Sequence, residues 1–207
     1  TWLLWLFGAL YIAGPVIGWL LATLVFVELY LGRKSIAIVP ARVWLWLAAM
    51  AALLLILWAG HANFSLGTGQ TIKSSIGWAK GWALIALFML AGAVLDIRVS
   101  VIARAACRLG MWTLVILPLF LAAPFIGLPE TLWVSPLKAV GGPGPEYFAT
   151  ILYTIEPGAG TPRWQFFAPW SPAAGMVALV YIFIAAREQN LAWRAAGLAG
   201  FLAIAVL

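Results

Sequence analysis

Apolar runs of about 20 residues recur along this chain, separated by short stretches that hold charged residues, Gly or Pro. One helix needs roughly 20 mostly apolar residues to cross the hydrocarbon core of a bilayer, which is about 30 Å thick. About a quarter of the residues of a typical soluble domain are charged, whereas 9% are charged here and 65% are hydrophobic. The sequence therefore predicts an all-α fold, in the form of a polytopic transmembrane helix bundle.

Six runs meet this length criterion, so we expect about six spans. The first is long enough to tilt or bend, and Gly14 and Pro15 near its middle predict a kink. The chain begins and ends inside apolar runs, so we expect a single transmembrane domain over residues 1–207 that is a portion of a longer protein. The six runs cover approximately residues 2–31, 42–60, 76–95, 98–126, 169–186 and 191–207.

Lys and Arg divide unevenly between the two sets of connections. Because cytoplasmic loops are enriched in these residues, the side with more of them is predicted to be cytoplasmic. The N-terminus and the connections at residues 61–75 and 127–168 are then extracytoplasmic. The net charge of +6 reflects this asymmetry and attraction to membrane lipids rather than a nucleic-acid partner. Eight of the twelve basic residues lie on the predicted cytoplasmic side: Arg33, Lys34, Arg42, Arg98, Arg104, Arg108, Arg187 and Arg194.

The connection at residues 127–168 alternates Pro and Gly with large aromatic residues, most densely at residues 141–148. Loops longer than about 12 to 15 residues are usually functional or disordered, and the aromatic content argues against disorder. We expect an ordered extracytoplasmic loop with a short interfacial helix at residues 145–153. A structural plug over the bundle is the alternative.

Residues 160–175 place one arginine among aromatics and prolines where a membrane helix begins. Arg163 offers a planar fork that matches phosphate, and the following helix, with Pro172 in its first turn, presents free N–H groups. The pattern indicates a site for an anion such as a lipid pyrophosphate, with Trp164 beside it. Alternatively, Arg163 and Trp164 belong to an interface belt.

Lys73 and Lys80 lie seven residues apart, which is about two helical turns, so a helix through both aligns them on one face. Two cations at the outer mouth of the bundle would bind phosphates; interfacial anchoring is the alternative. No strand precedes this Lys/Ser cluster, so it is not a P-loop. We expect no cofactor.

Few residues offer acid–base chemistry. His61 is the only histidine, and it is a candidate general base or a structural residue. Glu146 is the accessible carboxylate and is expected to contact sugar hydroxyls or Arg163, or to be a solvated loop charge. Glu28 lies close enough to Arg33 for an ion pair. No metal cluster is visible, because His61 and the single cysteine, Cys107, fall on opposite predicted sides.

The spans and the stretch at residues 163–175 resemble the bacterial O-antigen ligase and polysaccharide polymerase superfamily. These are membrane glycosyltransferases that act on undecaprenyl-pyrophosphate-linked glycans. In that family an outer-loop arginine precedes an Asn-Pro turn and a helix start rich in small residues. Arg163 matches the arginine, whereas residues 169–172 replace the Asn-Pro turn. The resemblance covers roughly the C-terminal half, and the family's large catalytic loop would lie beyond Leu207.

The resemblance implies transfer of a glycan from an undecaprenyl-pyrophosphate donor to a sugar acceptor at the bacterial inner (plasma) membrane, without a metal ion. The leading hypothesis is an enzyme that binds this donor through Arg163, Trp164, Lys73 and Lys80. A non-catalytic subunit that packs against other membrane subunits is the alternative. The lack of charged residues in mid-span argues against an ion-coupled transporter.

Overall fold

A computed structural model describes residues 1–140 and 144–207 of the chain, and it is mainly helical. Within these described residues, four helical segments are long and apolar enough to cross a membrane: α2 (Leu10–Tyr30), α3 (Ala41–Asn63), the segment Gly67–Val94 and α6 (Val99–Ala122). The helices α7 (Ser171–Ala185) and α8 (Leu191–Val206) are apolar but shorter. The prediction of a membrane-embedded helical protein is supported, and the count of six spans stays a prediction.

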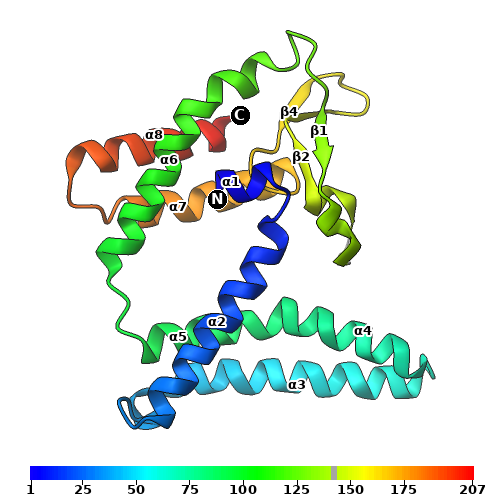
Figure 1. Cartoon of the computed structure of the whole chain (residues 1–207), viewed down its shortest axis with the longest axis vertical. Helices are drawn as coiled ribbons and strands as arrows, with labels where there is room; N and C mark the ends of the chain where they lie inside the picture. The colour runs from blue at the N-terminus through cyan, green and yellow to red at the C-terminus, as the bar shows by residue number, and fades with distance from the viewer. Residues whose placement is uncertain (141–143) are drawn as a thin grey trace. The chain divides into compact units, whose positions relative to one another are not determined.

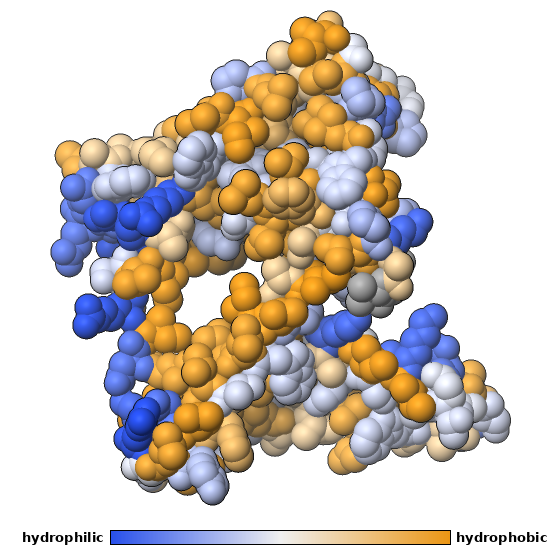
Figure 2. Space-filling view, in the orientation of Figure 1, coloured by the Kyte–Doolittle hydropathy of each residue, from blue (hydrophilic) through white to orange (hydrophobic). Residues whose placement is uncertain are grey.

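The apolar surface of these helices is mostly uncovered by protein. Only 11% of the most apolar window of α2, 11% of that of α3 and 28% of that of α6 is buried. Figure 2 shows hydrophobic residues over much of the visible face. Helices that expose apolar side chains on every side need a non-aqueous surrounding. Lipid is the surrounding that this composition requires.

The chain divides into two compact units. The first unit comprises residues 1–11 and 98–207, and the second comprises residues 12–97. Figure 1 labels their elements.

In the second unit, α3 packs against α4 (Gly67–Lys80) and α5 (Trp82–Val94), which are separated at Gly81. Two indole N–H groups tie α3 to α4: that of Trp58 donates to Ser75 Oγ at 2.9 Å, and that of Trp78 donates to the carbonyl of Met50 at 3.0 Å. A small apolar core joins α2, α3, α5 and the 3-10 helix η1 (Ile36–Ile38) with its flanking residues: Val25, Val39, Val43, Ala91 and Val94.

The predicted loop at residues 61–75 is wrong over most of its length, because α4 begins at Gly67. Ser65 and Gly67 adopt positive φ values of 52° and 77°, and the chain reverses there tightly. The polar side chains of the first turns are satisfied within the helix. Thr71 Oγ donates to the carbonyl of Gly67 at 3.0 Å, and Ser75 Oγ donates to that of Thr71 at 2.8 Å.

The first apolar run forms two helices, and the kink at Gly14 and Pro15 stays a prediction. It forms α1 (Trp2–Leu6) and α2, and the break falls at Gly8, which has a φ of 59°, whereas α2 continues through Pro15. A Cβ at Gly8 would meet Ser135 Cβ at 2.6 Å. Both the backbone conformation and this close approach therefore require glycine.

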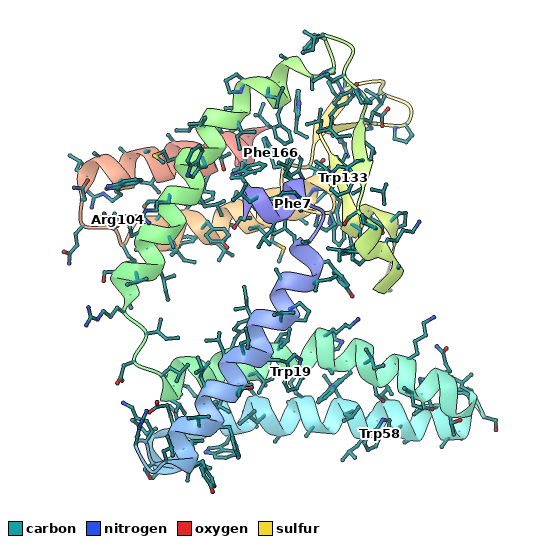
Figure 3. All side chains as sticks on the ribbon, viewed as in Figure 1. Phe7, Trp19, Trp58, Arg104, Trp133 and Phe166 are labelled. Atoms are coloured by element: carbon teal, nitrogen blue, oxygen red, sulfur yellow. The ribbon has the colours of Figure 1, made fainter. Side chains whose placement is uncertain are left out.

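In the first unit, α6 crosses α8 at glycines, and α7 packs beside both helices. A Cβ at Gly197 would lie 2.8 Å from Cys107 Cα, so the two backbones are nearly in contact. The core holds several fully buried aromatics, among them Phe166 (Figure 3), and Trp2 and Trp5 of α1 pack against Phe120.

The predicted ordered loop after α6 contains short β-strands, which the sequence analysis missed. The strand β1 (Thr131–Val134) pairs antiparallel with β2 (Ala149–Ile151), and β3 (Tyr153–Ile155) pairs antiparallel with β4 (Pro162–Trp164). The predicted helix over residues 145–153 is wrong, because only the 3-10 helix η3 (Pro145–Phe148) forms before β2. The β-branched residues Thr150, Ile151, Thr154 and Ile155 favour strands in this stretch. A second 3-10 helix, η2 (Pro136–Val140), follows β1, and residues 141–143 of the predicted Gly/Pro segment lie outside the described residues.

Candidate functional site

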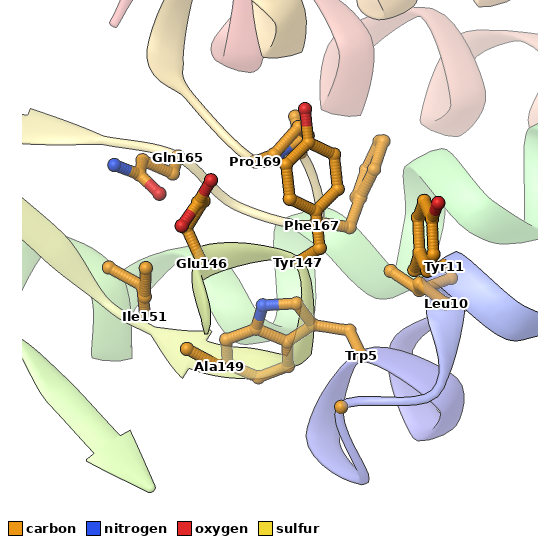
Figure 4. A pocket seen from close by; sticks show the side chains of 12 residues that line it. Trp5, Leu10, Tyr11, Glu146, Tyr147, Ala149, Ile151, Gln165, Phe167 and Pro169 are labelled. Carbon is orange, nitrogen blue, oxygen red and sulfur yellow. The ribbon is translucent and has the colours of Figure 1, made fainter. Parts of the chain in front are cut away.

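A pocket of about 250 Å³ opens in the first unit between the N-terminal segment and the loop at residues 144–169. Its walls are largely aromatic, and Figure 4 shows the rings of Trp5, Tyr11, Tyr147 and Phe167 around it. The rings of Tyr11 and Tyr147 meet edge to face, with their centroids 5.3 Å apart. Two polar side chains, Glu146 and Gln165, line the same pocket.

The helix α1 forms the wall of the pocket that contains Trp5. Because α1 ends at Leu6, its last carbonyls lack partners within the helix. The Trp133 indole N–H donates to the carbonyl of Leu6 at 2.7 Å, and the Thr150 hydroxyl lies 3.1 Å from the carbonyls of Trp5 and Leu6. The paired strands β1 and β2 therefore hold α1 against the loop, and Trp5 is only 9% exposed.

Gln165 is the most informative residue of the pocket. It is 7% exposed; its Nε2 lies 3.5 Å from Thr154 Oγ1, and its Oε1 has no hydrogen-bond partner. In this orientation of the amide, its oxygen therefore lacks a protein partner. A buried polar group without a partner is costly, and here it lines an aromatic pocket.

The chain is strained directly after Gln165. Phe166 has a φ of 50°, which a non-glycine residue adopts at a cost. Its ring is 1% exposed and lies 5.2 Å from the ring of Phe120, so burial of the side chain compensates for the backbone conformation. The strained turn fixes the direction in which the chain passes from β4 to α7, and with it the place of Gln165.

Glu146 lies in η3 and is exposed at the pocket. Its carboxylate folds over Gly144, where a Cβ would collide with it. Among the described residues, none donates a hydrogen bond to this carboxylate. Glu146 is therefore an available acceptor beside the amide of Gln165, and both lie on the same side of the pocket in Figure 4.

Arg163 and Trp164 lie on β4, directly before Gln165, but neither of them lines the pocket. The Arg163 guanidinium pairs with the carboxylate of Glu156, and its side chain remains half-exposed. The partner of Arg163 is thus Glu156 and not Glu146. Trp164 donates its indole N–H to the carbonyl of Phe120 at 2.7 Å and packs against the core.

The other predicted site residues belong to the second unit. Lys73 and Lys80 lie in one helix, α4, as predicted, with Lys73 exposed and Lys80 half-buried. The Nδ1 atom of His61 lies 3.1 Å from Thr71 Oγ1, so its partner is a hydroxyl and not a carboxylate. Over residues 1–140 and 144–207, no group of three His, Cys, Asp or Glu side chains could hold a metal ion. The expected pair of Arg33 and Glu28 forms, at 3.3 Å.

A second polar cluster was missed by the sequence analysis. Arg104 on α6 contacts Glu188 through two hydrogen bonds of 2.6 and 2.9 Å, and the backbone N–H of Asn190 donates to the same carboxylate at 2.9 Å. These donors, Arg104 first, lower the pKa of Glu188 to about 2. The guanidinium of Arg104 also lies 5.3 Å from the centroid of the Trp193 ring.

No local signal identifies that pair, because its members are 84 residues apart. The pocket residues are similarly dispersed, although Gln165 falls inside the stretch at residues 160–175 that the sequence analysis selected. Comparison of the chain with protein-family models, with curated proteins and with solved structures finds no match.

Proposed function

We propose that this chain belongs to a bacterial inner-membrane protein of surface-polysaccharide assembly, and that its aromatic pocket binds one sugar of an undecaprenyl-pyrophosphate-linked glycan. The observation that carries the proposal is the buried, unpartnered amide atom of Gln165 at an aromatic-walled pocket. The resemblance of residues 163–175 to the ligase and polymerase superfamily supplies the class of substrate.

The chemistry of the pocket suits a sugar. Aromatic rings pack against the C–H faces of a pyranose, while its hydroxyls donate to carboxylates and amides. Trp5 and Tyr147 supply such rings, and Glu146 and Gln165 supply the acceptors. At about 250 Å³ the pocket is smaller than typical small-molecule sites of about 300–1,000 Å³. It therefore accommodates one ring rather than a whole glycan.

In the transferase form of the proposal, an acceptor hydroxyl attacks the anomeric carbon of the donor sugar. The bond from that carbon to the pyrophosphate oxygen breaks, and the lipid pyrophosphate leaves with the electron pair. Glu146 takes the proton of the attacking hydroxyl. Arg163 stabilises the charge that develops on the pyrophosphate, after it exchanges Glu156 for the phosphate oxygens.

A non-catalytic glycan-binding subunit is the second candidate function. The scarcity of acid–base groups favours it: the sequence has one histidine, His61, and this residue lies within hydrogen-bond distance of Thr71. Both forms share the sugar pocket, and they differ in whether Glu146 is required for turnover or only for binding.

Saturation-transfer difference NMR on the detergent-purified chain, with a panel of methyl glycosides as probes, tests the pocket. We expect saturation of at least one glycoside in the wild type and its loss in Gln165→Leu. The matched control is Gln70→Leu, which makes the same change at an exposed position of α4. Equal saturation in wild type and Gln165→Leu, or none with any glycoside, would refute the sugar pocket.

The role of Arg163 is tested by two variants with opposite expected effects. Binding of undecaprenyl pyrophosphate should weaken about tenfold in Arg163→Ala, as for the loss of a charge-assisted hydrogen bond. It should strengthen in Glu156→Gln, because the competing carboxylate is removed. Unchanged binding in both variants would mean that Arg163 only stabilises the hairpin through Glu156. The proposal of a sugar pocket would still stand in that case.

A further inference from the structure

Besides the aromatic pocket, the first unit contains a larger hollow of about 730 Å³ between α6 and the connection from α7 to α8. Ser100, Arg104 and Arg108 line it from α6, and Glu188, Gln189 and Asn190 line it from the connection. None of these residues lines the pocket assigned to a sugar. Figure 3 labels Arg104 on α6.

The charges of the hollow do not balance. Arg104 is neutralised by Glu188, with which it forms the two hydrogen bonds described above. Arg108 forms no ion pair with any carboxylate in the described part of the chain. Its guanidinium lies 5.8 Å from the centroid of Trp193. A ring face attracts a cation but leaves its five N–H donors unsatisfied, so a positive charge with free donors remains in the hollow.

The place of Arg108 along α6 suits a contact with lipid. Arg108 lies nine residues after Val99 in a helix of 24 residues, in the half of α6 that begins on the predicted cytoplasmic side. The guanidinium of an arginine on the first turns of a membrane helix reaches the level of the lipid headgroups.

We propose that the hollow binds the phosphate of an anionic glycerophospholipid, with Arg108 as the phosphate ligand. Arg108 offers the planar fork that phosphate accepts. Arg104 is held by Glu188, and its guanidinium contacts the same Trp193 ring as that of Arg108. Trp112 and Val115 follow Arg108 by four and seven residues, on the same face of α6 and toward the membrane centre. Their exposed apolar side chains offer a surface for acyl chains, which favours a lipid over free phosphate.

Native mass spectrometry on the detergent-purified full chain tests this site, with phosphatidylglycerol and phosphatidylcholine as probes. We expect the wild type to retain phosphatidylglycerol in preference to phosphatidylcholine. Arg108→Gln should weaken phosphatidylglycerol about tenfold, the factor expected for one charge-assisted hydrogen bond. Arg42→Gln, the same change at an exposed arginine at the start of α3, should leave it unchanged.

A second variant covers the case in which Arg108→Gln does not fold. Ala105→Phe keeps every charge and fills the hollow from its α6 wall, so it should also displace phosphatidylglycerol. Equal retention of the two lipids, or identical behaviour of Arg108→Gln and Arg42→Gln, would overturn the proposal. Displacement of the lipid by inorganic phosphate alone would reassign the hollow to a soluble anion. Because the methyl glycosides probe other residues, failure here is distinguishable from failure of the sugar pocket.

Discussion

The amide of Gln165 combines two properties that rarely occur together: it is nine-tenths buried, and one of its polar atoms has no partner. Folding alone does not explain this arrangement, because burial of an unpaired polar atom costs free energy. Under the proposed function, a sugar hydroxyl would satisfy this atom once the side chain turns toward the pocket. The residue is therefore expected to reduce the stability of the free protein and to contribute to binding.

Replacement of Gln165 by Leu separates these two effects. The side chains have similar volumes, and Leu removes the unpaired atom, so the free energy of unfolding should be unchanged or higher by up to about 1 kcal/mol. Sugar binding should be lost in the same variant. Thermal unfolding in detergent measures the first effect. A clear loss of stability in Gln165→Leu would show that Gln165 is needed for folding and would remove this argument for a ligand.

Glu188 gives the first unit a predictable response to acid. Its pKa is lowered from 4.5 to about 2, mainly by Arg104 and by the N–H of Asn190. A depressed pKa in the folded state means that the contribution to stability is complete above about pH 4.5 and is lost as the pH falls through about 2. Glu188→Gln should therefore unfold at a lower temperature at pH 7, and its difference from the wild type should shrink between pH 4.5 and pH 2.

Thermal scans across that pH interval check the assignment. An equal difference between Glu188→Gln and the wild type at both ends of the interval would contradict it. Glu156→Gln is a suitable control, because Glu156 also pairs with an arginine but lies in an exposed hairpin.

At the scale of elements, the crossing of α6 and α8 is the tightest contact of the first unit. A Cβ at Gly200 would collide with the backbone of Gly110, and a Cβ at Gly110 would collide with that of Gly197. Small residues that allow helix backbones to approach closely are typical of membrane helix pairs.

Gly200→Ala is consequently expected to destabilise the protein by about 1–3 kcal/mol, the range for overpacking against atoms that cannot move aside. Gly175→Ala is the matched control, because a Cβ at Gly175 on α7 meets nothing within 4 Å. It should be neutral or slightly stabilising, since Ala favours a helix over Gly. Equal stability of the two variants in thermal unfolding would mean that α6 and α8 are not in close contact.

Hydropathy predicts helices well where lipid contact determines the sequence. The second run was expected at residues 42–60, and α3 spans Ala41–Asn63. Hydropathy fails where contacts with distant segments of the same chain determine the structure. The turn after α1 depends on Gly8 fitting against Ser135, and β1 pairs with a strand that follows it by 15 residues or more. The start of α4 was missed because its first turns are polar and bond to their own backbone.

The candidate site was even less accessible to sequence-based prediction. The pocket joins residues near the N-terminus to residues beyond 144, and nothing local connects Trp5 with Gln165. Arg163 and Glu146 could be selected because charged residues are scarce in this chain. Their partners could not, since Arg163 pairs with Glu156 across a hairpin that was not predicted.

At the scale of the whole molecule, the distribution of Lys and Arg predicts which connections face the cytoplasm. The single cysteine, Cys107, is fully buried, so the native chain provides a background with little labelling. A cysteine at Thr161 should react with a membrane-impermeant maleimide in intact cells, whereas one at Gln189 should react only after the membrane is opened. Both native positions are exposed. The reverse pattern would invert the predicted topology.

The central claim is that the sugar of a lipid-linked glycan occupies the pocket of Gln165 and Glu146. The most direct measurement compares the affinities of the purified protein for undecaprenyl pyrophosphate with and without an attached saccharide, in the wild type and in Gln165→Leu. We predict that the saccharide strengthens binding to the wild type and that this gain disappears in Gln165→Leu, while binding of the bare lipid is unchanged. A saccharide that adds nothing in the wild type, or adds equally in both proteins, would contradict the account.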